Sequence, residues 1–224
     1  MKTLTRELRD KISPIEAIEI LRKGNGRFVE NLKINRNLLQ QVNETSNGQH
    51  PFAVILSCID SRTSAELIFD QGLGDIFSVR IAGNIQNADI LGSLEFSCKV
   101  AGAKVVVVLG HTKCGAVKGA CDHVKLGNLT TLLEKLKPAV DGEKSTTLER
   151  NASNSEFVEK VASLNVKITQ KQIMKNSPIL LEMIDKGEIA LIGGMYDVET
   201  GLVNFYDDEI ETAGTIERKT IALL

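Results

Sequence analysis

The sequence predicts an α/β fold: a parallel-core β-sheet with an antiparallel edge strand, flanked by helices and preceded by an N-terminal helical arm. Three apolar, β-branched runs predict buried parallel strands, and helical patterns separate them: 52–57, 75–80 and 104–109. This β-α-β-α-β order implies right-handed crossovers. With 224 residues, 42% of them apolar, and no linker, the chain is expected to form one domain.

The N-terminal arm, residues 1–48, is expected to be helical and amphipathic. Ser13 can cap a helix that begins at Pro14, and Glu16 can complete a capping box. The Gly-Asn-Gly segment 24–26 is expected to interrupt this helix, because each glycine costs about 1 kcal/mol relative to alanine. An amphipathic arm must pack either on its own domain or on a partner subunit.

Apolar spacing and cap residues predict the helices that lie between and after the strands. They cover 64–70, 87–100, 115–122, 129–136 and 155–175, and another begins at Ser177-Pro178. Pro138 is expected to end the fourth of these helices. Residues 189–196 and 202–206 predict a hairpin, with the first arm in the core sheet and the second at its edge.

Composition excludes several classes of function. The net charge of -2 gives no electrostatic case for a nucleic-acid or membrane partner. The apolar runs are far shorter than the roughly 20 residues of a membrane helix, and the first ten residues lack the apolar core of a signal peptide. A cytoplasmic location is therefore expected. There, four cysteines favour metal binding or catalysis over disulfides, while Cys98 and Cys121 are expected to pack in the core.

Two polar motifs follow two of the predicted strands, at residues 57–62 and 110–115. Because ligands bind at the carboxyl ends of the strands in open α/β sheets, Cys58, His111 and Cys114 can meet there. Two thiolates and an imidazole favour zinc, and a catalytic zinc site keeps one coordination position open. The alternative interpretation is that these cysteines are small buried hydrophobic residues.

Asp60 and Arg62 follow Cys58 closely in the first motif. Asp60 can reach the fourth metal position, which closes the site. Arg62 can hold a carboxylate through two hydrogen bonds, so pairing of the two side chains is expected to leave the site open. Because two thiolates neutralise the zinc charge, bound water should have a pKa above the value of about 7 on an all-histidine zinc, which predicts an alkaline-shifted activity profile.

The two motifs read Cys58-x-Asp60-x-Arg62 and His111-x-x-Cys114-Gly115. Together with Arg80-x-x-x-Asn84, they resemble the β-class carbonic anhydrases, and the resemblance covers most of the chain. It implies a single domain over 1–224 and one zinc ion per subunit, held by the two cysteines and the histidine. Asp60 would be a ligand in the closed form only. With Arg62, it would catalyse the reversible hydration of carbon dioxide to bicarbonate and a proton through zinc-bound hydroxide.

The same resemblance assigns five positions to substrate binding: Gln49, Phe77, Ala82, Phe96 and Gly115. Gln49 and Phe77 match the always-open, plant-like type, whereas the bicarbonate-regulated type carries a tryptophan where this chain has Ile55. Ala82 replaces the usual valine and Phe96 the usual tyrosine. Both substitutions keep the pocket apolar, but the missing hydroxyl can alter proton transfer or product release.

The family also implies an assembly, a homodimer or homotetramer with active sites at subunit interfaces, in which the arm 1–48 would contact a partner. The substrates would be carbon dioxide and bicarbonate. Two alternatives remain: hydrolysis of carbon disulfide or carbonyl sulfide on the same scaffold, and a non-catalytic zinc-binding regulatory protein. Asp60, Arg62 and Gln49 argue against the second, because a purely structural site needs no positioned carboxylate.

Overall fold

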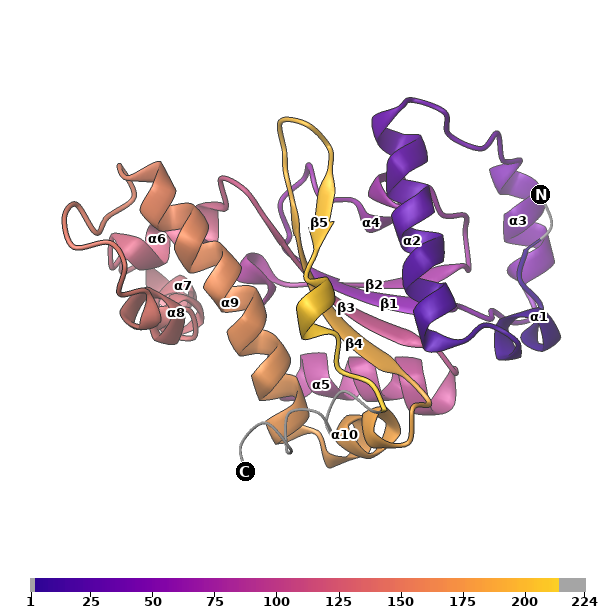
Figure 1. Cartoon of the computed structure of the whole chain (residues 1–224). Helices are drawn as coiled ribbons and strands as arrows, with labels where there is room; N and C mark the ends of the chain where they lie inside the picture. The colour runs from indigo at the N-terminus through magenta and orange to yellow at the C-terminus, as the bar shows by residue number, and fades with distance from the viewer. Residues whose placement is uncertain (1–2, 214–224) are drawn as a thin grey trace.

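The computed structural model describes residues 3–213, and within them five strands form one sheet in the order β2-β1-β3-β4-β5 (Figure 1). The strands are β1 (Ala53–Ser57), β2 (Ile76–Arg80), β3 (Val105–His111), β4 (Ala190–Tyr196) and β5 (Val203–Phe205). The first four are parallel, and β5 pairs antiparallel with β4 at one edge. The predicted parallel core and antiparallel edge strand are confirmed.

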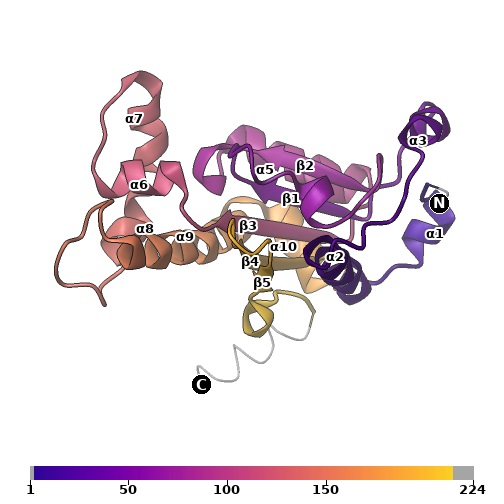
Figure 2. The same ribbon diagram turned by 90° about the horizontal axis from the view of Figure 1, so that it is seen from above.

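Helices bury both faces of this sheet, as Figures 1 and 2 show. One face packs against α2 (Pro14–Val29) and α4 (Ala65–Ile68), and the other against α5 (Ala88–Glu95), α9 (Ser155–Asn176) and α10 (Pro178–Asp185). Successive strand side chains point to opposite faces, so Ile55 joins the first core and Val54 the second. Continuous apolar runs are therefore required, as the sequence predicts.

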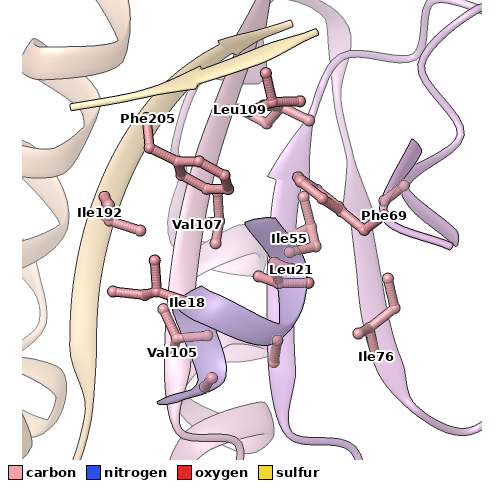
Figure 3. Close-up of a cluster of buried hydrophobic side chains, with 14 of the residues drawn as sticks. Ile18, Leu21, Ile55, Phe69, Ile76, Val105, Val107, Leu109, Ile192 and Phe205 are labelled. Carbon is pink, nitrogen blue, oxygen red and sulfur yellow. The ribbon is translucent and has the colours of Figure 1, made fainter. Parts of the chain in front are cut away.

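Figure 3 shows the core beneath α2. Ile18 and Leu21 of α2 lie against the sheet, where Val107 and Ile192 are fully buried. Each such side chain contributes about 1.5–3 kcal/mol when it is buried. Helix α2 is thus part of this chain's own core. It begins with the expected capping box, in which Ser13 and the side chain three residues further on bond each other's backbone amides.

The expected interruption of α2 at residues 24–26 is wrong, because the helix continues to Val29. The Asn25 amide is buried and donates to the carbonyl oxygens of Ile68 and Gly201. A Cβ atom at Gly24 would lie 1.8 Å from the Phe69 carbonyl oxygen. Here glycine permits close packing of α2 on the segment after α4, and this packing outweighs its low helix propensity.

Five further α-helices lie at the two ends of the molecule: α1 (Arg6–Asp10), α3 (Leu38–Thr45), α6 (Gly115–Cys121), α7 (Gly127–Glu134) and α8 (Lys137–Gly142). Pro138 lies in the first turn of α8, where its missing N–H is not needed, instead of directly ending the preceding helix. No helix within residues 3–213 has the length and apolar character required to cross a membrane.

A third apolar cluster lies at one end of the molecule, where α6, α7 and α8 pack against the first half of α9 (Figure 2). Its buried members include Leu136 and Phe157, together with Cys58 and Cys114. The carboxyl ends of β1 and β3 therefore run directly into this helical cluster. This arrangement shields the cysteines of the two polar motifs from solvent.

Candidate metal centre and active site

Three ligand side chains converge at the carboxyl edge of the sheet. Cys58 follows β1, His111 is the last residue of β3, and Cys114 directly precedes α6. Because β1 and β3 are paired neighbours, the two motifs meet. The two sulfur atoms are 4.0 Å apart, and all three ligand atoms lie within 4.8 Å of one another. All three residues are buried.

The His111 ring is held in the orientation that a metal ligand needs. Its Nδ1 lies 2.8 Å from the Thr112 carbonyl oxygen, which can only accept a hydrogen bond, so Nδ1 carries the proton. Nε2 is buried and has no hydrogen-bond partner among the described residues. A tetrahedral zinc places two thiolates about 3.8 Å apart. The three side chains therefore fit a zinc ion, with the backbone fixing the imidazole.

The two cysteine thiols influence each other strongly. A hydrogen bond from Cys114 holds the pKa of Cys58 well below its ordinary value, and the Gly83 amide, 3.4 Å from the Cys58 sulfur, acts in the same direction. The hydrogen bond with Cys58 and burial raise the pKa of Cys114. One thiolate thus forms readily, and a bound zinc ion would be held by both sulfur atoms once the remaining proton is lost.

The other two cysteines have a different environment. Cys98 and Cys121 are buried among apolar side chains, as expected from the sequence. Burial raises the pKa of Cys98 to about 12 and that of Cys121 to about 11. Within residues 3–213, Cys58, His111 and Cys114 form the cluster that could hold a metal ion, and neither Cys98 nor Cys121 belongs to it. Their position therefore assigns these two cysteines to the core.

Asp60 and Arg62 form the paired arrangement that the sequence predicts. Asp60 Oδ1 accepts from Arg62 Nε at 2.9 Å, and Oδ2 accepts from Nη2 at 2.7 Å. These hydrogen bonds hold the pKa of Asp60 well below its ordinary value, so the carboxylate is ionised. Asp60 Oδ2 also lies 4.0 Å from His111 Nε2. An acceptor-only group therefore stands beside the three ligand atoms while both of its oxygens bind Arg62.

Two residues for which the sequence predicts no role, Arg80 and Thr63, fix the loop that carries Cys58 and Asp60. Arg80 donates from Nε to the Cys58 carbonyl oxygen at 3.0 Å and from Nη2 to the Asp60 carbonyl oxygen at 2.6 Å. Thr63 Oγ1 donates to the same two oxygens. Arg80 ends β2 opposite the end of β1, so only the strand register places it there.

The five predicted substrate-binding residues separate into two groups. Ala82 lies in the 3₁₀ turn η1 (Ala82–Asn84), beside the glycine that contacts Cys58, and Gly115 follows Cys114 directly. The other three are not brought to the metal ligands within this chain. Phe77 lies on the edge strand β2, three residues or about 10 Å before its carboxyl end. It contacts Phe96, with ring centroids 6.2 Å apart. Gln49 lies before the amino-terminal end of β1, whereas the metal ligands lie at the carboxyl ends of the strands.

The fold and the site define a zinc-binding α/β enzyme with its metal at the carboxyl edge of a parallel sheet. The family described as carbonic anhydrase matches residues 53–203. Carbonic anhydrase 2 of Mycobacterium tuberculosis is 35% identical over 197 residues, covering 84% of this chain and 91% of the relative. The carbonic anhydrase of Mycolicibacterium smegmatis is 32% identical, covering 85% and 92%.

Solved structures agree with this match. The β-carbonic anhydrase CafA of Aspergillus fumigatus is 31% identical with a TM-score of 0.67, covering 75% of this chain and 81% of that one. A structure of tetrameric β-carbonic anhydrases from Sordaria macrospora is 25% identical with a TM-score of 0.65, covering 74% and 85%. The chain belongs to the β-carbonic anhydrase family.

Proposed function

We infer that the chain is a zinc-dependent carbonic anhydrase that converts carbon dioxide and water reversibly to bicarbonate and a proton. The observation that carries this inference is the cluster of Cys58, His111 and Cys114 beside an ionised carboxylate. When bound, zinc supplies a Lewis acid that activates water for attack on carbon dioxide. The relatives described above are carbonic anhydrases, which favours this reaction over hydrolysis of carbon disulfide or carbonyl sulfide.

We assign Asp60 and Arg62 to the catalytic machinery. Asp60 accepts a hydrogen bond from the reacting water and so directs the water's lone pair toward the substrate carbon. Arg62 occupies both carboxylate oxygens and keeps Asp60 from becoming a metal ligand. Loss of this pairing frees Asp60 to take the fourth metal position and close the site. Ala82 and Gly115 provide a small apolar wall for carbon dioxide.

We further propose a homodimer or homotetramer in which Gln49, Phe77 and Phe96 complete the active site of a partner subunit. Phe96 is 53% exposed although it is a large aromatic residue, and it contacts Phe77 of the edge strand β2. The arm 1–48 also exposes apolar side chains on α3, among them Leu39. Covering these groups with a second copy would bury them and supply the missing pocket residues.

We propose a cytoplasmic location for the protein, because free thiols persist in a reducing environment. All four cysteines are free, and two of them are metal ligands in this proposal. Oxidation of Cys58 and Cys114 to a disulfide would remove both sulfur ligands. A reducing compartment protects the centre from this loss.

A stopped-flow hydration assay with a pH indicator tests the proposed activity. Zinc-loaded protein should hydrate carbon dioxide, lose that activity when a chelator removes the metal, and regain it when zinc is restored. Equal activity with and without metal would contradict the zinc mechanism. Persistent inactivity with one zinc bound per subunit would instead favour the non-catalytic alternative.

A further inference from the structure

The glycine beside the metal ligands is held from both sides. The Gly83 N–H donates to Cys58 Sγ at 3.4 Å, and the Gly83 carbonyl oxygen accepts from Asn165 Nδ2 at 2.9 Å. All three residues are buried. Asn165 lies on α9, 82 residues away in sequence. A continuous hydrogen-bonded path therefore connects the middle of α9 to a sulfur ligand.

Asn165 is an unusual residue for its position. It is 2% exposed and lies on the buried face of α9, next to Val161, Ala162 and Val166. A buried amide is stable only when it is hydrogen-bonded. Its hydrogen bond goes to the carbonyl of the residue that contacts Cys58. This hydrogen bond satisfies the buried amide and connects α9 to the turn that carries Gly83.

The turn that contains Gly83 needs this external support. Gly83 and Asn84 both have left-handed backbone conformations, with φ values of 70° and 42°. Such a conformation is uncommon for a residue with a side chain. Asn84 Nδ2 is itself buried without a hydrogen-bond partner among the described residues. A Cβ atom at Gly83 would lie 3.0 Å from Leu136, so that side chain also packs closely on the turn.

We propose that Asn165 is a positioning residue for the metal centre. By holding the Gly83 carbonyl, it aims the Gly83 N–H at the Cys58 sulfur. That hydrogen bond fixes the orientation of the thiolate and withdraws electron density that the sulfur would otherwise donate to the metal. The proposal rests on the zinc site of the proposed function and adds to it a contact from outside the two sequence motifs.

The Asn165→Leu variant tests this role, because leucine is close in size but cannot donate to Gly83. Zinc affinity is measured by competition with a chromophoric chelator, and the sulfur-to-metal charge-transfer band is recorded in cobalt-substituted protein. Zinc binding should weaken by about 10- to 100-fold. The charge-transfer band should move to lower energy, because a thiolate without its hydrogen bond donates charge more readily.

Gln170→Leu is the matched control. Gln170 is an equally buried amide on the same helix, but it lies beside Gly193 of β4. It should leave the affinity and the band unchanged. A folded Asn165→Leu protein with the wild-type band and affinity would overturn the proposal, as would equal changes in both variants. A wild-type site without a sulfur-to-metal band would instead overturn the zinc site itself.

Two further measurements keep the test decisive if Asn165→Leu does not fold. Asn165→Ala removes the same donor with the residue that favours helices most, and it should show the same shift. In wild-type protein loaded with an NMR-active cadmium isotope, scalar coupling should connect the metal to the Gly83 amide proton through the sulfur. Absence of that coupling would contradict the first step of the proposal.

Discussion

The carboxyl ends of the strands are covered by helices α6–α9, whereas large apolar side chains are exposed beside the edge strand β2, at Phe96, and on α3 of the N-terminal arm. At the covered edge, Cys58, His111 and Cys114 meet within one chain. At the exposed edge, Phe77 and Phe96 contact each other but lie away from these ligands. The resemblance in sequence predicts that both regions belong to one active site.

This difference separates two kinds of site residue. Metal ligands on neighbouring parallel strands are brought together by the sheet topology alone, because the strand ends coincide. Sheet topology does not bring Gln49, Phe77 or Phe96 to the metal ligands of the same chain. A second copy of the chain is the simplest way to place them there. The predictions below test whether the first region is self-sufficient and whether the second acts across an interface.

The largest expected effect concerns the metal ligands. Cys58→Ser should abolish zinc binding at the site and lower the hydration rate by at least about 10³-fold, because serine is a poor zinc ligand and the metal supplies the activated water. Cys98→Ser is the matched control, since Cys98 is equally buried but lies on the helical turn after α5. Metal analysis and stopped-flow kinetics measure both variants. Equal zinc contents in the two would contradict the assignment of Cys58.

The second expected effect concerns the carboxylate beside the metal. Asp60→Asn should lower the hydration rate by about 10²- to 10⁴-fold, the usual range for a positioned acid–base group. Zinc content should be unchanged, because Arg62 holds Asp60 away from the ligands. Asp185→Asn, at an exposed helix end, serves as the control. A rate loss that only follows zinc loss would assign Asp60 a structural role instead.

The third prediction tests the interface directly by mixing two impaired variants. If Gln49 acts on the partner's zinc, a dimer of one Gln49→Ala subunit and one Cys58→Ser subunit should contain one intact site. The first subunit keeps its zinc ligands, and the second supplies Gln49 to that zinc. An equal mixture should then regain about a quarter of the wild-type activity, since half of the dimers are mixed. Refolding the two variants together, followed by a hydration assay, measures this. No gain over the separately refolded variants would show that Gln49 does not act across the interface.

The fourth prediction compares two glycines of α2. Gly24→Ala should destabilise the protein by about 1–3 kcal/mol or more, because its Cβ would collide with the Phe69 carbonyl oxygen. Gly26→Ala meets no atom within 4 Å and should stabilise the helix by about 0.5–1 kcal/mol. Urea unfolding of both variants measures the difference. Similar effects at the two positions would refute the close packing of α2.

The smallest expected effect concerns Glu143, at the end of α8. Hydrogen bonds from the Ser145 hydroxyl and from the Ser145 and Thr146 amides hold the pKa of Glu143 at about 2. An unfolded glutamate has a pKa of about 4.3, so the ionised form stabilises the fold above that pH and loses this contribution as the pH falls toward 2. Glu143→Gln should cost about 1 kcal/mol at neutral pH and progressively less in acid. Urea unfolding at several pH values measures this, and a constant difference would contradict it.

Sequence patterns identified the strands and metal ligands because both follow from local signals. An apolar run followed by polar residues marks the end of a strand, and the pairing of two such motifs on parallel strands favours metal binding over simple burial of the cysteines. The sequence does not predict that α2 continues through Gly24, because a tertiary contact with Phe69 decides this, nor that Pro138 lies in the first turn of a new helix that begins at Lys137. Asn165 has no local signal at all, because its partner lies on a distant turn.

X-ray absorption spectroscopy at the zinc edge of active, freshly purified protein tests the central claim most directly. The three-ligand site predicts two sulfur neighbours at about 2.3 Å and an imidazole nitrogen at about 2.0–2.1 Å, with a light atom in the remaining position. Cys58→Ser should lose sulfur scattering together with activity. Zinc bound in active wild-type protein without sulfur neighbours would contradict the proposed site.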